Sequence, residues 1–296
     1  MRKNKIKVSA SSRIFDVFNV LLMIAVVICT FYPMIHIVMA SFSDGNLLLE
    51  HRGILFKPLD FTLGGYKMVF KDPMILRGYA NTIFVVVAGT FISVLLTATG
   101  AYFLSRKNVM LQMPVMLYVM FTMFFSGGMI PFYFTVKDLG LYNSIWSLIL
   151  PTAINTFNLI IMRTGFSAIP DSLEESAKLD GAGHLTILFK IVIPLAMPTI
   201  AVIILYYAVS YWNSWFNAMM FIQDRVKYPL QLVLRGVLMS NDTSAMTGGV
   251  NAVDKESVGE SVKYGVIVVA TIPILVVYPF LQKYFVKGVM IGAVKG

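Results

Sequence analysis

Six apolar runs, each long enough to cross a lipid bilayer, constrain the fold of this chain more than any other feature. An α-helix rises about 1.5 Å per residue, so roughly 20 apolar residues span the ~30 Å hydrocarbon core. Only 13% of the 296 residues are charged, against about 25% in a typical soluble domain. The sequence therefore predicts an all-α, multi-pass membrane protein with six transmembrane helices. The runs lie near residues 14–40, 80–104, 110–136, 142–162, 195–218 and 264–284.

Polar segments between these runs divide the chain into membrane and extramembrane parts. The first run is much longer than the ~7–15 residues of a signal-peptide core, so we expect it to be a retained helix. The core that follows it contains two long polar loops, at 170–194 and 219–262. The expected parts are a basic cytoplasmic segment (1–13), a first transmembrane helix (14–40), an extracytoplasmic loop (41–79), the membrane core (80–284) and a cytoplasmic tail (285–296).

The distribution of charge predicts the orientation in the membrane. With six spans, both termini lie on the same side. Segments on that side hold thirteen Lys and Arg against five Asp and Glu, whereas those on the opposite side hold eleven against ten. The positive-inside rule then makes both termini cytoplasmic. The net charge of +9 is explained by topology, and we expect no nucleic-acid partner.

The cores of spans two to six contain no Asp, Glu, Lys or Arg. Ion-coupled secondary transporters usually need such groups, so their absence disfavours that class, which we keep as the alternative. The same absence weakly favours a neutral solute. The chain also has no P-loop, and its three histidines and single cysteine, Cys29, predict no metal site. No paired carboxylates or Ser/His/Asp set lies at membrane depth, so a membrane enzyme ranks last.

A polar, amphipathic stretch at 174–194 separates the fourth and fifth runs. Its spacing of Glu, Ala, Gly, Ile and Pro resembles the EAA loop of ABC importer permeases. In that family the loop forms a short coupling helix that docks in a cleft of a separate ATPase subunit. The motif residues are Glu175, Ala177, Gly181, Ile191 and Pro194, with Ser176 and Ile193 where Ala and Leu are usual. The implied ATPase-coupling residues are Glu174, Glu175, Ala177, Asp180, Gly181, Ala182 and Pro194.

The resemblance continues from about residue 14 to the C-terminus and is to carbohydrate-importer permeases, with complex-oligosaccharide permeases as the sub-group. It implies the type I (MetI-like) permease fold with a cytoplasmic coupling helix, in a bacterial cell membrane. It also implies that a C-terminal tail contacts the ATPases. The matching stretches are 126–131, 140–144, 149–151, 212–213, 228–231, 282–288 and 292–296, and the tail residues are Gly292, Lys295 and Gly296.

The resemblance further implies the partners and the chemistry. The chain would be a non-catalytic half of the translocation pathway, paired with a second homologous permease. Two ATPase subunits would bind the ATP and Mg, so this chain needs no cofactor of its own. The other partners are an extracytoplasmic sugar-binding protein, which we expect to dock on 219–262, the saccharide and membrane lipid.

Aromatic and amide side chains in the fourth and fifth runs are candidates for the sugar pathway. Sugars stack their C–H faces on aromatic rings and pair their hydroxyls with amides. The alternatives stay open, because Trp and Tyr also mark membrane interfaces and Asn also forms hydrogen bonds between helices. The break at 126–128 should face protein or an aqueous path, because lipid cannot satisfy its backbone. The pathway candidates are Asn155, Asn158, Tyr211, Trp212, Asn213 and Trp215.

Overall fold

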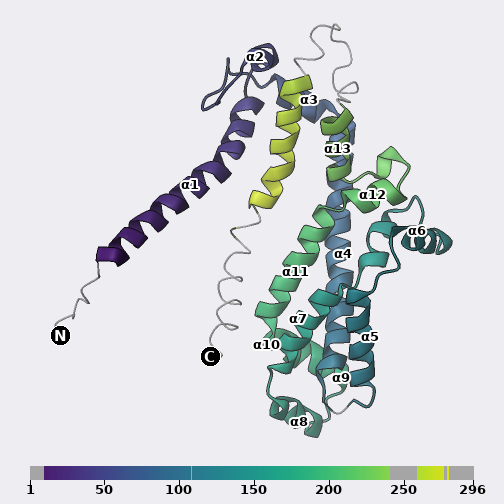
Figure 1. Cartoon of the computed structure of the whole chain (residues 1–296). Helices are drawn as coiled ribbons and strands as arrows, with labels where there is room; N and C mark the ends of the chain where they lie inside the picture. The colour runs from purple at the N-terminus through teal and green to yellow at the C-terminus, as the bar shows by residue number, and fades with distance from the viewer. Residues whose placement is uncertain (1–9, 108, 241–258, 277–278, 280–296) are drawn as a thin grey trace. The chain divides into compact units, whose positions relative to one another are not determined.

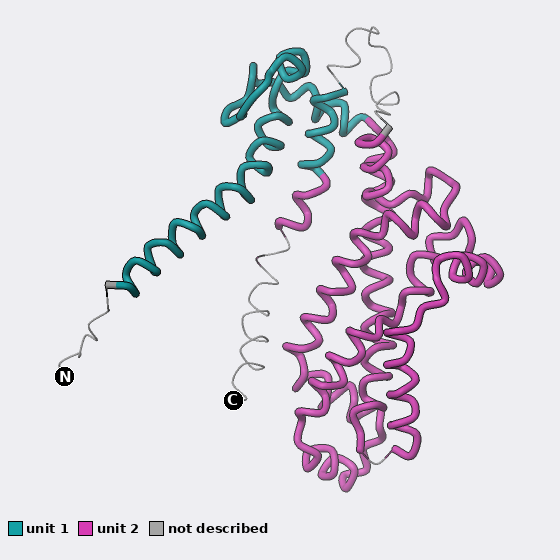
Figure 2. Tube along the Cα trace, in the orientation of Figure 1, with its two compact units in different colours: residues 1–71, 241–269 teal, residues 72–240, 270–296 magenta. Residues whose placement is uncertain are grey.

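The computed structural model of the chain describes residues 10–107, 109–240, 259–276 and 279. These residues are mainly helical, and the only strand-like pairing among them is an isolated bridge between Ser43 and Phe61. The chain divides into two compact units, 1–71 with 241–269 and 72–240 with 270–296 (Figure 2). The tail residues Gly292, Lys295 and Gly296, and the loop at 241–258, lie outside the described residues.

The first unit contains the long helix α1 (Ala10–Ser41) followed by two short helices, α2 (Gly45–Glu50) and α3 (Gly64–Lys71). Most side chains of α1 are apolar and exposed in the isolated chain, as expected for a helix that faces lipid or another membrane protein. At its end, the Ser41 hydroxyl is 2.8 Å from the Tyr66 hydroxyl, which joins α1 to α3.

The second unit is a bundle built around one helix, α4 (Pro73–Ser105). Three further helices pack against α4, namely α7 (Thr156–Ser167), α11 (Met197–Trp212) and α13 (Leu230–Ser240) (Figure 1). The Asp72 carboxylate caps α4 at its N-terminus, and proline at the first position suits a helix start because its missing N–H has no helical partner there.

Small residues and buried hydroxyls hold α4 and α11 together. The Thr97 hydroxyl lies 2.7 Å from the Tyr207 hydroxyl, and the Ser93 hydroxyl lies 2.8 Å from the Tyr211 hydroxyl. Gly89 faces the Tyr211 ring so closely that a Cβ there would be 2.8 Å from a ring atom. Small residues and polar pairs of this kind are the usual means of packing helices in lipid, where apolar contact with a neighbour gains little over contact with lipid.

Only some of the predicted spans are continuous helices. Among the described residues, three helices are long and apolar enough to cross a membrane, and there are up to six crossings if each of three bent pairs is one span. The runs at 110–136, 142–162 and 195–218 therefore contain breaks. In the last of them α11 ends at Trp212, and residues 215–218 belong to a separate helix, α12 (Trp215–Phe221). The continuous spans are 11–41, 73–105 and 259–276; the bent pairs are α5 (Gln112–Phe124) with α6 (Met129–Asp138) at 117°, 145–152 with α7 at 50°, and 184–195 with α11 at 89°.

Local chemistry explains two of these breaks. Gly128, before α6, has φ of 87°, a left-handed conformation that favours glycine. The right-angle bend before α11 falls at Ala196, between Pro194 and Pro198, and follows a π-helical turn at 188–192. Because proline cannot donate a helical hydrogen bond, prolines two residues before and two residues after Ala196 favour a bend there.

Candidate functional site

The predicted coupling segment lies at one end of the second unit (Figure 1). It consists of α8 (Asp171–Leu179), a tight turn, and α9 (His184–Ile187), which leads through the π-helical turn into α10 (Ile193–Leu195). Asp171 and Glu174 lie in the first turn of α8 and Lys178 in its last, which complements the helix dipole.

Gly181 ends α8 in a Schellman motif. Its N–H donates to the carbonyl of Lys178, and the N–H of Ala182 donates to the carbonyl of Ala177 at 2.9 Å. The φ of Gly181 is 82°, and a Cβ there would meet no atom within 4 Å. Conformation, and not lack of space, therefore requires glycine at this point of the EAA-like spacing.

The coupling segment presents an exposed surface of mixed character. Glu175 and Asp180 are exposed, whereas Ala177 and Ala182 are half-buried and pack against the core. Leu179 is 90% exposed, an unusual position for a leucine and one that was not predicted from the sequence. Asp180 beside it, Glu175 one helical turn earlier and the turn that follows it would have marked it. Two carboxylates around an apolar side chain suit the docking of another protein. Pro194, also exposed, lies apart from this surface in α10.

Glu174 is placed differently from its neighbour Glu175. It is 7% exposed, and its Oε2 lies 2.6 Å from Nη1 of Arg106 at the end of α4. Its Oε1 lies 3.0 Å from Nζ of Lys178 and accepts a hydrogen bond of 3.2 Å from the Tyr102 hydroxyl. The carboxylate of Glu174 thus faces the helix bundle, where it cannot present its charge to a docking partner.

Three of the six pathway candidates line one hollow of about 670 Å³ between α7 and α11. Its lining is entirely uncharged. Asn155 caps α7, because its Oδ1 accepts from the Asn158 N–H, while Tyr211 is buried and bonded to Ser93. Tyr206, Tyr207 and Ser210 also line the hollow, and their spacing on α11 could have indicated it. The full lining is Thr152, Asn155, Phe157, Asn158, Leu205, Tyr206, Tyr207, Val209, Ser210 and Tyr211.

The other three pathway candidates do not line this hollow. Trp212 is 9% exposed, and its indole N–H has no hydrogen-bond partner among the described residues. Asn213 follows α11 and donates to the carbonyl of Val209, so it acts as a helix cap. The Trp215 ring stacks beneath the Arg235 guanidinium, 4.6 Å from its centroid.

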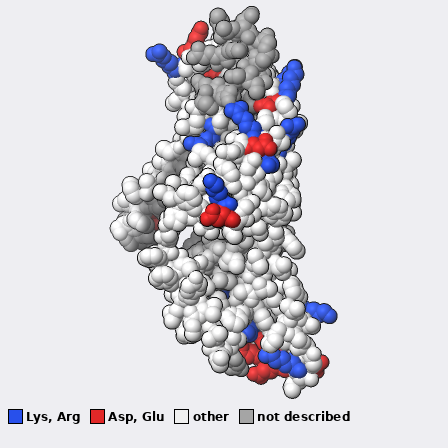
Figure 3. Space-filling model, turned by 90° about the vertical axis from the view of Figure 1, so that its right-hand side faces the viewer, with Lys and Arg blue, Asp and Glu red and all other residues white. Residues whose placement is uncertain are grey.

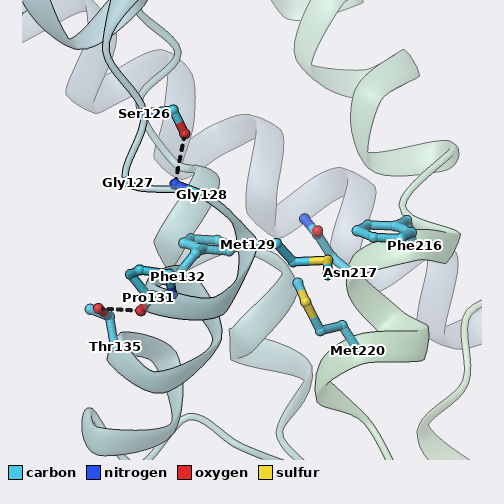
Figure 4. A pocket seen from close by; sticks show the side chains of 10 residues that line it. All are labelled: Ser126, Gly127, Gly128, Met129, Pro131, Phe132, Thr135, Phe216, Asn217 and Met220. Carbon is cyan, nitrogen blue, oxygen red and sulfur yellow. Dashed lines mark hydrogen bonds between the residues drawn. The ribbon is translucent and has the colours of Figure 1, made fainter.

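A second hollow, of about 510 Å³, lies at the break in the third run. In Figure 4, Ser126 and Gly128 are on one side of it and Phe216, Asn217 and Met220 of α12 are on the other. The Ser126 hydroxyl accepts a hydrogen bond of 3.2 Å from the Gly128 N–H. The break at 126–128 therefore faces α12 across an open space, in keeping with the expectation that it should not face lipid.

Asn143 holds the turn at the start of the fourth run. It has φ of 56°, and its Oδ1 accepts from the backbone N–H groups of Gln223 and Asp224 at 3.1 and 3.0 Å. The Lys227 ammonium donates a hydrogen bond of 2.8 Å to the backbone carbonyl of Asn143. In the sequence, 140–144 stands out only through its resemblance to the permease family, so this structural role was not predicted.

On the face drawn in Figure 3, charged side chains gather at the lower end and are scattered over the upper half, and a mostly uncharged band lies between these two areas. An uncharged band of this kind fits a surface that lies in hydrocarbon. Within the described part of the chain, no group of three or more His, Cys, Asp and Glu could hold a metal ion. Cys29 is a free, exposed thiol on α1.

Comparisons with known proteins agree on one kind of protein. The sequence profile described as "Binding-protein-dependent transport system inner membrane component" matches residues 75–291. "Polygalacturonan/rhamnogalacturonan transport system permease protein YtcP" of Bacillus subtilis (strain 168) is 46% identical over 292 residues, covering 96% of this chain and 99% of the relative. "Protein LplC" of the same organism is 45% identical over 288 residues, covering 97% and 96%.

A solved structure agrees with these relatives. It is described as a "bacterial ABC transporter involved in the import of the acidic polysaccharide alginate". One of its chains superposes with a TM-score of 0.87 at 36% identity, covering 95% of this chain and 100% of that one.

Proposed function

This chain belongs to the family of inner membrane components of binding-protein-dependent transport systems, and we propose that it is the permease subunit of an ATP-driven importer of oligosaccharides. It forms half of the translocation pathway and passes the motion of the ATPases to the membrane helices. The chain itself is non-catalytic, and its partners bind the ATP and Mg. The ion-coupled alternative loses support, because importers of this family use ATP.

The observation that carries this proposal is the exposed coupling segment. An amphipathic helix, a Schellman turn and exposed Glu175, Leu179 and Asp180 together form a compact docking surface at the end of the bundle. A rigid helix of this kind can transmit a partner's movement to the helices above it, as a two-state change biased by nucleotide.

We further propose that the partners are a second homologous permease, two ATPase subunits and an extracytoplasmic sugar-binding protein. The apolar, unburied side chains of α5 are consistent with contact to lipid or to the second permease. The loop at 219–262 is the proposed docking surface for the binding protein. The tail residues Gly292, Lys295 and Gly296 are proposed to contact the ATPases.

Acidic oligosaccharides are the substrates that we propose. A relative named for polygalacturonan and rhamnogalacturonan, and the solved alginate importer, both concern polymers that contain uronic acids. The hollow between α7 and α11 offers hydroxyls, amides and aromatic rings but no cation. We therefore expect this chain to bind sugar hydroxyls and ring faces, while cations that balance the carboxylates come from the binding protein or the second permease.

Copurification tests the proposal directly. The tagged chain is coexpressed with its proposed partners, an ATPase, a second permease and a binding protein of the same organism, as wild type and as Glu175→Lys. The matched control is Asp138→Lys, which reverses an exposed carboxylate on α6. The ATPase should copurify with wild type and with the control, and be lost from Glu175→Lys while the second permease is retained.

Two results would count against this assignment. An ATPase absent from every preparation would remove the motor and revive the ion-coupled alternative. An ATPase retained by Glu175→Lys, in a complex that takes up oligogalacturonates at the wild-type rate, would show that the coupling surface lies elsewhere.

A further inference from the structure

The backbone connections of the coupling segment to the membrane helices are both jointed. On one side, α7 ends at Ser167 and the chain turns through Pro170 before α8 begins. On the other side, the chain passes through a π-helical turn and the 89° bend at Ala196 before α11. A segment held only by these two joints could swing when pushed, without moving the bundle.

Side chains make a third, stiffer connection, to the inner end of α4. Arg106 and Glu174 form an ion pair with an N–O distance of 2.6 Å, and their side chains are only 11% and 9% exposed. Solvent and salt screen a buried ion pair far less than an ion pair at the surface. Lys178, one turn further along α8, adds a second cation at 3.0 Å from the same carboxylate.

Tyr102, one turn before Arg106, extends this connection to α9. Its hydroxyl bonds to Glu174 at 3.2 Å and lies 3.1 Å from Nδ1 of His184, the first residue of α9. The Arg106 guanidinium lies over the Tyr102 ring, 4.9 Å from the centroid. Both parts of the coupling segment therefore meet one turn of α4.

The end of α4 is also joined to the rest of the bundle. Arg163 of α7 donates from Nε to the carbonyl of Leu104 at 3.1 Å. Further along, Ser93 and Thr97 of α4 bond to tyrosines of α11 that line the hollow. A displacement of α4 is thus carried to the helices of the pathway by packed contacts.

We propose that Arg106, acting through Glu174 and Tyr102, is a positioning residue that clamps the coupling segment to α4, so that ATPase motion enters the bundle through α4. This α4–α8 clamp (Tyr102, Arg106, Glu174) rests on the proposed function, since it presumes a motor docked on α8. It assigns Glu174 to transmission within the chain and leaves Glu175 to docking.

The test uses the full coexpressed complex in nanodiscs, with Ser210→Cys in a Cys29→Ala background as the reporter. Ser210 is exposed in the hollow, so its maleimide labelling rate should change when ATP and vanadate switch the pathway. The readouts are this labelling change, the ATPase rate and the amount of bound ATPase. Arg106→Met removes the clamp, and Lys107→Met is the matched control, because its ion pair with Asp171 is 82% and 60% exposed.

In wild type and Lys107→Met, nucleotide should change the labelling rate equally. In Arg106→Met the ATPase should stay bound and active, while the nucleotide-dependent change shrinks by about fivefold or more, the range of a typical coupling energy. The double variant Arg106→Glu with Glu174→Arg, which exchanges the two charges, should recover part of the nucleotide-dependent change in labelling rate. A purely structural defect would instead lower ATPase binding and activity together.

An Arg106→Met complex that hydrolyses ATP and switches like wild type would overturn the clamp while leaving the importer intact. Should Arg106→Met fail to assemble, the isosteric Glu174→Gln decides, with reduced switching expected and wild-type switching contradicting the clamp. A wild-type complex that shows no nucleotide-dependent labelling would reject the proposed function, and the clamp with it.

Discussion

Gly181 is a single residue whose conformation, more than its size, accounts for its place in the coupling segment. Its φ of 82° costs a residue with a Cβ roughly 1–2 kcal/mol. Gly181→Val should therefore weaken the turn and lower uptake, while Gly181→Asn, which tolerates the left-handed region, should keep most of it. ATP-driven uptake in proteoliposomes measures the difference. An equal loss of uptake in both variants would contradict the conformational explanation. It would indicate that the open space around Gly181 must stay free of any side chain.

Asn143 has a left-handed backbone conformation, and its side chain is hydrogen-bonded to the segment after α12; we call these two hydrogen bonds, to Gln223 and Asp224, the strap. Asn143→Ala loses two hydrogen bonds of about 0.5–1.5 kcal/mol each and adds backbone strain. We expect it to lower the free energy of unfolding by about 2–4 kcal/mol on the same principles. Asn143→Asp keeps the acceptor and the backbone preference, so its Tm in detergent should stay near wild type. An alanine variant as stable as the aspartate variant would contradict the role of the strap.

The contact between helices α4 and α11 depends on the absence of a side chain at Gly89. The Tyr211 ring cannot retreat freely, because its hydroxyl is bonded to Ser93. Gly89→Ala should therefore cost about 1–3 kcal/mol through overpacking and should narrow the hollow that Tyr211 lines. Thermal unfolding of the purified complex measures this cost.

The same helix supplies the control. A Cβ at Gly100 would meet only the terminal Cδ1 of Leu159, at 3.2 Å, and a leucine end can shift. Gly100→Ala should change the Tm much less than Gly89→Ala, and Tyr211→Leu should relieve the clash at Gly89. Similar losses from the two alanine substitutions would show that ring contact is not the cause.

The orientation of the chain in the membrane can be tested with single cysteines, because Cys29 is the only native one. In a Cys29→Ala background, Lys137→Cys should react with a membrane-impermeant maleimide on intact cells. Lys107→Cys, whose native side chain is 82% exposed, should react only after permeabilisation. The reverse pattern would place the termini outside and contradict the positive-inside argument.

Much of the fold could be anticipated because bilayer thickness and loop charge act on the linear sequence directly. The six apolar runs follow from run length and agree with the up to six crossings that the described helices allow. The permease fold was implied by the resemblance at 174–194 and is confirmed by the fold match and the family. The break at 126–128 was also visible, since consecutive glycines interrupt an apolar run. The angles of 117°, 50° and 89° were not, because bend geometry depends on how neighbouring helices pack.

The linear sequence thus specified the class of protein, the number of apolar runs and the position of the coupling turn, all of which depend on short-range spacing. Glu174 and Glu175 are adjacent and chemically identical, and only the tertiary structure distinguished them. It buries Glu174 against Arg106, which lies 68 residues earlier in the chain. It likewise brought Asn155, Asn158 and Tyr211 to one hollow and left Trp212 outside it. Burial and contact between distant helices are set by packing, which no local pattern records.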